Sequence, residues 1–211
     1  MSYALVANTG VGNNGAGPTT TTGIDTTGAT LLVVAVSTFT GVPNVTDSNG
    51  NIWLRVPSVV NSATIQMFYC ANPTVGAAHT FTVATDFPGI CVAAFSGTTT
   101  DAWPEGPTST TGNTSLTLPT ITPAQDDSIV VTMLGQGASA VTMSIDGGFT
   151  KTDEVGGTTA QKCALAYLIQ TSAAAAAPTW TWAGGIATAV QMAVWHETSG
   201  GGSPVAYPFM G

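Results

Sequence analysis

Residues 31–36 read LLVVAV, an unbroken apolar run rich in valine. A run of this kind is typical of a β-strand whose two faces are both covered, because a strand with one wet face would alternate apolar and polar residues. We therefore predict a strand at the centre of a sheet. The pattern returns at residues 129–133 (IVVTM), where Ile129 aligns with Leu32.

Three further pairs of segments match in the same order, and the offset stays between 97 and 100 residues throughout. They are 65–69 with 164–168, 79–83 with 178–182, and 92–95 with 192–195. Four matches in one order at nearly constant spacing indicate an internal duplication. We predict an all-β fold, an antiparallel jelly-roll-like or immunoglobulin-like sandwich made of two tandem pseudo-repeats, at residues 15–97 and 112–197.

Two arrangements of the repeats fit this pattern. They form separate small sandwiches joined through residues 98–112, or two halves of one larger sandwich related by a pseudo-twofold axis. We favour one fused domain over residues 1–199, because a six-stranded unit alone would have an awkward core. Turns are expected at residues 47–50 (DSNG) and 146–148 (DGG), at matching places in the repeats.

Charge excludes several partners. Charged residues make up 7% of the chain, and the net charge is −8. The three basic residues, Arg55, Lys151 and Lys162, are too few to neutralise several phosphates, so nucleic acid is excluded as a partner. No stretch approaches the roughly 18 to 20 apolar residues of a membrane span, and no membrane partner is expected. The N-terminus lacks the features of a secretory signal peptide.

Residues suited to catalysis are few. His79 and His196 are expected at the surface, without a nucleophile elbow or a paired-histidine metal spacing. The neighbours Asp153 and Glu154 would point to opposite faces of a strand, which does not suit joint acid–base work. We predict no catalytic residue and no enzyme; a glycosidase with two carboxylates in a cleft is the alternative.

Each of the three cysteines, Cys70, Cys91 and Cys163, lies inside an apolar run. We expect buried free thiols, which pack as small hydrophobic side chains. One disulfide with one free thiol is the alternative.

The turn at residue 47 carries the one candidate for a metal. Asp47, Asn49 and Asn51 place oxygen-bearing side chains at alternate positions, as calcium loops do, but the glutamate that would complete an EF-hand is missing. A hydrogen-bonded Asx turn accounts for the same residues, and we favour it over calcium. No other cofactor is expected.

Tryptophan could serve a sugar site, because aromatic faces stack on sugar rings. Trp180 and Trp182 share one face of a strand by alternation and are expected in the core. Trp53 and Trp103 lie next to turns and are the better candidates for exposed contacts.

Residues 200–211 form an unusual C-terminal segment. A glycine hinge is followed by an apolar arm punctuated by proline. We predict that the arm binds a partner through Pro204, Val205, Tyr207, Pro208, Phe209 and Met210. Folding back onto its own domain is the alternative.

Three segments carry a family resemblance: the run at 31–36, the turn at 45–53 (VTDSNGNIW) and the strand-like stretch at 90–97 (ICVAAFSG). Together they resemble a loosely defined group of phage and bacterial surface proteins, which share an Asp-Ser-x-Gly-Asn-x-Trp turn followed by a strand ending in Phe-Ser-Gly. The resemblance implies a fold and transfers no catalytic residue.

Within that group, a small acidic all-β chain looks most like a phage capsid decoration or accessory virion protein. This implies a non-enzymatic structural protein at the virion surface. Its partners would be other virion proteins, the major capsid protein or neighbouring copies in a homo-oligomer. The alternative is a secreted, extracellular carbohydrate-binding or adhesin β-sandwich module.

Overall fold

The computed structural model describes residues 3–39, 41, 43–56, 59–60, 64–97, 103–110, 113–137, 141–157, 159–184 and 188–197. Every helix or strand among them is a β-strand, so the predicted all-β fold is confirmed. The described residues accordingly contain no helix that could cross a membrane.

The first half of the chain forms a large antiparallel sheet and a small one. The large sheet has the order β1-β9-β3-β7-β5, with β6 also beside β7, and the small sheet has the order β2-β8-β4. The bounds are β1 Ala4–Gly12, β2 Thr19–Thr20, β3 Leu31–Thr38, β4 Val45–Asp47, β5 Leu54–Arg55, β6 Val59–Val60, β7 Thr64–Ala71, β8 Phe81–Val83 and β9 Gly89–Ser96.

The second half is built in the same way. Its large sheet has the order β10-β17-β12-β15-β14, and its small sheet has the order β11-β16-β13. The bounds are β10 Trp103–Thr110, β11 Ser115–Thr117, β12 Ser128–Gln136, β13 Met143–Ile145, β14 Thr150–Val155, β15 Lys162–Gln170, β16 Thr179–Trp182 and β17 Thr188–His196. Apart from β6, each strand of one half has a counterpart at the same place in the other.

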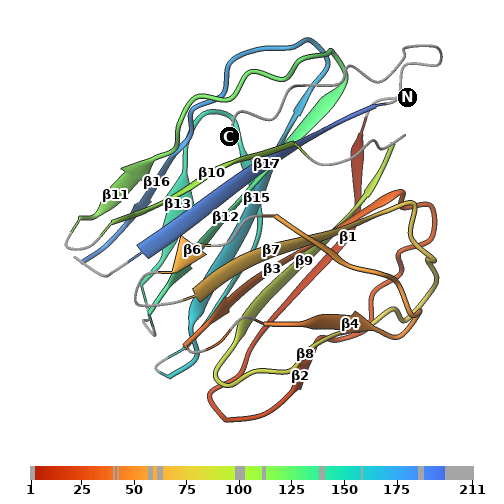
Figure 1. Ribbon diagram of the computed structural model, residues 1–211, viewed down its shortest axis with the longest axis vertical. Coiled ribbons are helices and arrows are strands. Elements are labelled where there is room, and N and C mark those ends of the chain that lie inside the picture. The colour runs from red at the N-terminus through yellow and green to blue at the C-terminus, as the bar shows by residue number, and fades with distance from the viewer. Residues whose placement is uncertain are drawn as a thin grey trace, which may run out of the picture.

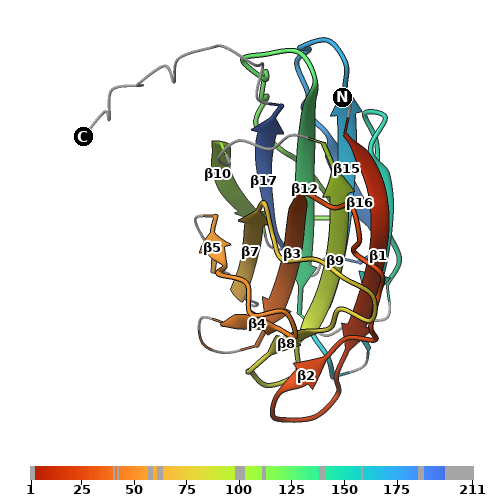
Figure 2. The same cartoon turned by 90° about the vertical axis from the view of Figure 1, so that its right-hand side faces the viewer.

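The four sheets form layers. The two large sheets pack face to face, with β1 against β14 and β9 against β15 at one side and β17 against β7 at the other. Each small sheet covers the outer face of its own large sheet, at the lower right and the upper left of Figure 1. Turned by 90°, the strands of the first large sheet run side by side from β1 to β7 (Figure 2).

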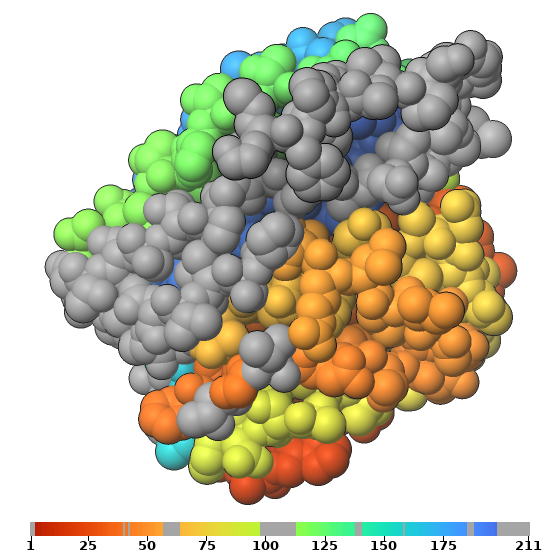
Figure 3. Space-filling model, in the orientation of Figure 1, coloured from red at the N-terminus to blue at the C-terminus, as the bar shows by residue number. Residues whose placement is uncertain are grey.

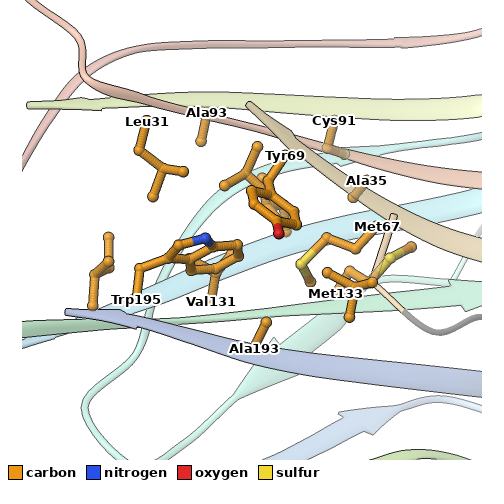
Figure 4. Packing of buried hydrophobic residues seen from close by; sticks show 14 of the residues in the cluster. Leu31, Ala35, Met67, Tyr69, Cys91, Ala93, Val131, Met133, Ala193 and Trp195 are labelled. Atoms are coloured by element: carbon orange, nitrogen blue, oxygen red, sulfur yellow. The ribbon is translucent and has the colours of Figure 1, made fainter. Parts of the chain in front are cut away.

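Three apolar clusters fill the spaces between the layers. One lies inside each half, and the third lies between the large sheets and includes Leu31, Tyr69, Val131 and Trp195 (Figure 4). Because both large sheets are covered on both faces, their central strands are buried throughout and apolar at most positions. This explains the run at 31–36, which β3 contains, and the predicted central place of that strand is confirmed.

The strand registers correct the sequence alignment of the halves. In the first half Leu31 pairs with Phe95, and in the second Ile129 pairs with Trp195. Both pairs face the central cluster, so Ile129 corresponds to Leu31 and not to Leu32, as the sequence alignment had it. A shift of one residue moves a side chain to the other face of the sheet, and an apolar run buried on both faces gives no alternation to prevent that error.

Candidate functional site

Asp47 anchors the polar site that the sequence analysis singled out. It ends β4 and opens a tight turn in which Gly50 has a φ of 73°, a conformation that suits glycine. One carboxylate oxygen accepts hydrogen bonds from the backbone N–H groups of Asn49 at 2.8 Å and Asn51 at 3.3 Å. The other accepts from Nε1 of Trp53 at 2.8 Å. Asp47 therefore fixes both the turn and the strand that follows it.

The two asparagines of the calcium candidate bind the neighbouring loop. Asn51 Oδ1 accepts the backbone N–H of Thr74 at 2.7 Å, and the side-chain amides of Asn49 and Asn51 both donate to the Thr74 carbonyl. With Asp47 they form the hydrogen-bonded Asx turn that the sequence analysis favoured over calcium. In the part of the chain that the structure describes, no group of three or more His, Cys, Asp or Glu side chains could hold a metal ion.

His79 completes this site from inside the fold, and its predicted place at the surface is wrong. The side chain is fully buried and stacks on the ring of Phe81, with centroids 4.4 Å apart. Its Nδ1 lies 3.0 Å from Oγ1 of Thr26, and its Nε2 lies 3.2 Å from Oδ1 of Asp47. The sequence could not predict this, because nothing near His79 in the chain indicates that a carboxylate and a hydroxyl contact its ring in the fold.

Thr26, His79 and Asp47 thus line up a hydroxyl, an imidazole and a carboxylate, the groups that nucleophilic catalysis also uses. Here the hydroxyl is held by the backbone of Gly76, because Thr26 Oγ1 accepts its N–H at 3.1 Å and donates to its carbonyl at 3.2 Å. Thr26 and His79 are both fully buried, so no substrate can reach the hydroxyl. The arrangement holds residues 24–26 against residues 76–79.

Hydrogen bonding controls the charge of Asp47. Burial by itself would raise the pKa of the carboxyl, but the N–H groups of Asn51 and Asn49, the Trp53 indole and His79 outweigh it. The pKa of Asp47 therefore lies below its ordinary value, and the carboxylate is the form that stabilises the turn.

A second polar cluster, which sequence reasoning missed, lies in the other half. Glu154 of β14 accepts the backbone N–H of Met143 and pairs with both lysines of the chain, Lys151 and Lys162, the latter at 2.8 Å. Burial would raise the pKa of Glu154, but the two lysines and the Met143 N–H lower it overall. The sequence could not predict this cluster, because a lysine 3 residues before a glutamate and another 8 residues after it come together only when β14 and β15 pair.

Asp153 points away from that cluster. Its carboxylate accepts a hydrogen bond from the side chain of Asn8 in β1, at 2.9 Å, across the contact between the halves. Burial raises the pKa of Asp153, and the Asn8 hydrogen bond offsets only part of this. The predicted opposite orientation of Asp153 and Glu154 is confirmed, so the two carboxylates do not share a site.

The remaining candidates are scattered. Trp180, Trp182 and Trp195 are buried, which confirms the expected core role of the first two. The half-buried ring of Trp53 packs edge to face on Phe81, and the side chain of Trp103 lies outside the described residues. Half-buried His196 ends β17 in the other half, and burial lowers its pKa.

Apolar side chains remain exposed beside the Asp47 turn. Ile52 is 82% exposed and Leu54 is 48% exposed, whereas Trp53 between them turns inward onto Phe81. Leu54 belongs to β5, at one edge of the first large sheet. The segment that contains them, coloured orange, lies on the surface in Figure 3. We call Ile52 and Leu54 the edge pair.

Comparison with protein-family models, curated proteins and solved structures gives no match. The predicted partner-binding residues of the C-terminal arm, Pro204 to Met210, lie outside the described residues.

Proposed function

We propose that this chain is a non-enzymatic structural protein of a phage virion, either a capsid decoration protein or another accessory protein of the particle surface. The sequence resemblance of the turn at 45–53 suggests the phage setting. The observation that carries the assembly role is the edge pair, because large exposed apolar side chains in and beside an edge strand favour contact with another chain.

The internal polar sites support the same proposal. Asp47, His79 and Thr26 are committed to one another and to nearby backbone groups, and Glu154 is committed to two lysines. Chemistry on a substrate needs reactive groups that a substrate can approach, whereas these groups hold loops and strands in place. A scaffold of this kind suits a protein that has to persist on a particle.

Copurification with intact particles tests the proposal. Particles from a gradient should contain the protein at a fixed copy number per particle, by quantitative mass spectrometry against the major capsid protein. Washing at moderate salt should not remove it, because an apolar contact is not screened by ions. Recovery of the protein only in free form from the culture medium contradicts the proposal and favours the secreted alternative.

A further inference from the structure

We propose that Cys91 and Cys163 form a disulfide that ties the two halves of the chain together when the protein folds under oxidising conditions. Three cysteines allow three different pairings, and the fold selects this one. The inference does not depend on the proposed function.

Position in the layers selects the pair. Cys91 of β9 and Cys163 of β15 are both fully buried in the central cluster, where β9 and β15 face each other. Cys70 of β7 belongs instead to the cluster inside the first half, on the opposite face of the same sheet. A sheet therefore separates Cys70 from Cys163, and Cys70 and Cys91 point to opposite faces of that sheet.

The two thiols lie close together. Cys91 Sγ is 3.5 Å from the backbone carbonyl of Cys163, and Cys163 Sγ is 3.6 Å from the carbonyl of Ala35, the strand partner of Cys91. The Cys91 sulfur therefore lies against β15, which contains Cys163. The Cys163 sulfur lies against β3, the strand next to β9, which contains Cys91. Burial raises the pKa of the Cys91 thiol well above its usual range, and the Cys163 thiol beside it raises it further.

A glycine lets β9 and β15 approach closely beside the cysteines. Facing sheets ordinarily lie about 10 Å apart, which is too far for a disulfide, whose Cα atoms are usually about 4 to 7 Å apart. At Gly89, two residues before Cys91, a Cβ atom would stand 3.0 Å from Cβ of Cys163. The absence of a side chain at Gly89 therefore brings β9 and β15 together beside the cysteine pair.

The chemistry balances with a low-molecular-weight disulfide such as oxidised glutathione as the oxidant. One cysteine thiolate attacks that disulfide, which forms a mixed disulfide and releases one glutathione. The second cysteine then attacks the protein sulfur of the mixed disulfide and releases the other glutathione. The two protein thiols lose two protons and two electrons, which the oxidised glutathione takes up. Because both thiols are fully buried, this exchange belongs to folding and not to the closed protein.

Oxidative refolding tests the inference. The full chain is unfolded with reductant, refolded in a mixture of reduced and oxidised glutathione, and alkylated. Its intact mass should show one alkylated thiol and the loss of two hydrogens from the other two cysteines. Trypsin leaves Cys70 and Cys91 in one peptide, because the chain has no Lys or Arg between Arg55 and Lys151. Chymotrypsin is therefore added, to cut after Phe81 and separate them.

Variants provide the control. Cys70→Ala should still form the cross-link, whereas Cys91→Ala and Cys163→Ala should both lose it. The oxidised wild type should also melt at a higher temperature than the same protein after reduction, since the bond closes a loop across 72 positions. Three free thiols after refolding, a bond that includes Cys70, or an oxidised form that melts lower than the reduced one would each overturn the inference.

Discussion

Tyr69 and Trp195 meet edge to face at the contact between the halves, with ring centroids 5.6 Å apart and an interplanar angle of 67°. Phe95 and Tyr167 form the same kind of pair, at 5.2 Å and 68°. Tyr167 pairs with Val131 in the second half, and Tyr69 pairs with the equivalent Val33 in the first, so the two tyrosines are counterparts. Phe95 and Trp195 are counterparts in the same way, so the two contacts are reciprocal.

Removing one ring should weaken that contact strongly. Trp195→Ala should lower the free energy of unfolding by about 3 to 5 kcal/mol, because a fully buried ring leaves a cavity that the sheets cannot close. Trp195→Phe should cost less, since it keeps a ring and removes an indole N–H that has no partner among the described residues. Urea unfolding followed by circular dichroism measures both. Equal losses would show that the ring does not pack as described.

Asp47 should matter more than Asp146, the aspartate of the corresponding turn in the second half. Asp47→Ala leaves the Trp53 indole and two backbone N–H groups without an acceptor, and should destabilise the protein by about 2 to 3 kcal/mol. The matched control is Asp146→Ala, because exposed Asp146 accepts one backbone N–H, from Thr179, and should cost about 1 kcal/mol. Thermal unfolding of the two variants measures the difference, and a smaller shift for Asp47→Ala would contradict this account.

Lowering the pH should change the free energy of unfolding in opposite directions through Glu154 and Asp153. The pKa of Glu154 is lowered on folding, so its stabilising contribution is present above the ordinary value of 4.5 and is lost as the pH falls through the lowered value. The pKa of Asp153 is raised, so its contribution is present below the ordinary value of 3.8 and is lost as the pH rises through the raised value.

Unfolding of wild type, Glu154→Gln and Asp153→Asn between pH 2 and pH 7, about the range in which carboxyl groups titrate, checks these signs. Glu154→Gln should flatten the loss of stability in acid, and Asp153→Asn should steepen it. If the stability of the two variants depended on pH in the same way, the opposite pKa shifts of Glu154 and Asp153 would be excluded.

The edge pair should be needed for assembly and not for folding. Replacing both Ile52 and Leu54 with Glu should abolish particle association with little change in melting temperature, because both side chains are exposed. Ala124→Glu adds a charge at another exposed position and should leave association intact. Particle binding after gradient purification is the measurement. Normal binding by the double variant would remove the edge pair from the proposal.

The C-terminal arm gives a separate prediction. Deleting residues 200–211 should weaken particle association while the melting temperature stays within a few degrees, since the described sheets do not include these residues. Association is compared with the full chain by the same gradient assay. A deletion that binds normally would show that the arm is not a partner-binding segment.

Sequence alone determined the all-β class and the central strands, because burial requires apolar residues at successive positions. It missed β10, which lies within the segment 98–112 that was expected to be a connection. The unbroken run at 31–36 predicts a strand covered on both faces, and the alternation of Phe81 and Val83 with threonine predicts one with a single buried face. Both features are local, and the structure confirms both.

Only the tertiary structure decided which distant side chains meet. His79 enters the core because β8 pairs with β4 and brings Asp47 to it, and Cys91 faces Cys163 because the large sheets pack through one particular face. Between partners 32 and 72 positions apart, spacing along the chain carries no information about distance in space. The distance in space depends on the register of the strands and on the face to which each side chain points. An apolar run that is buried on both faces shows neither in the sequence.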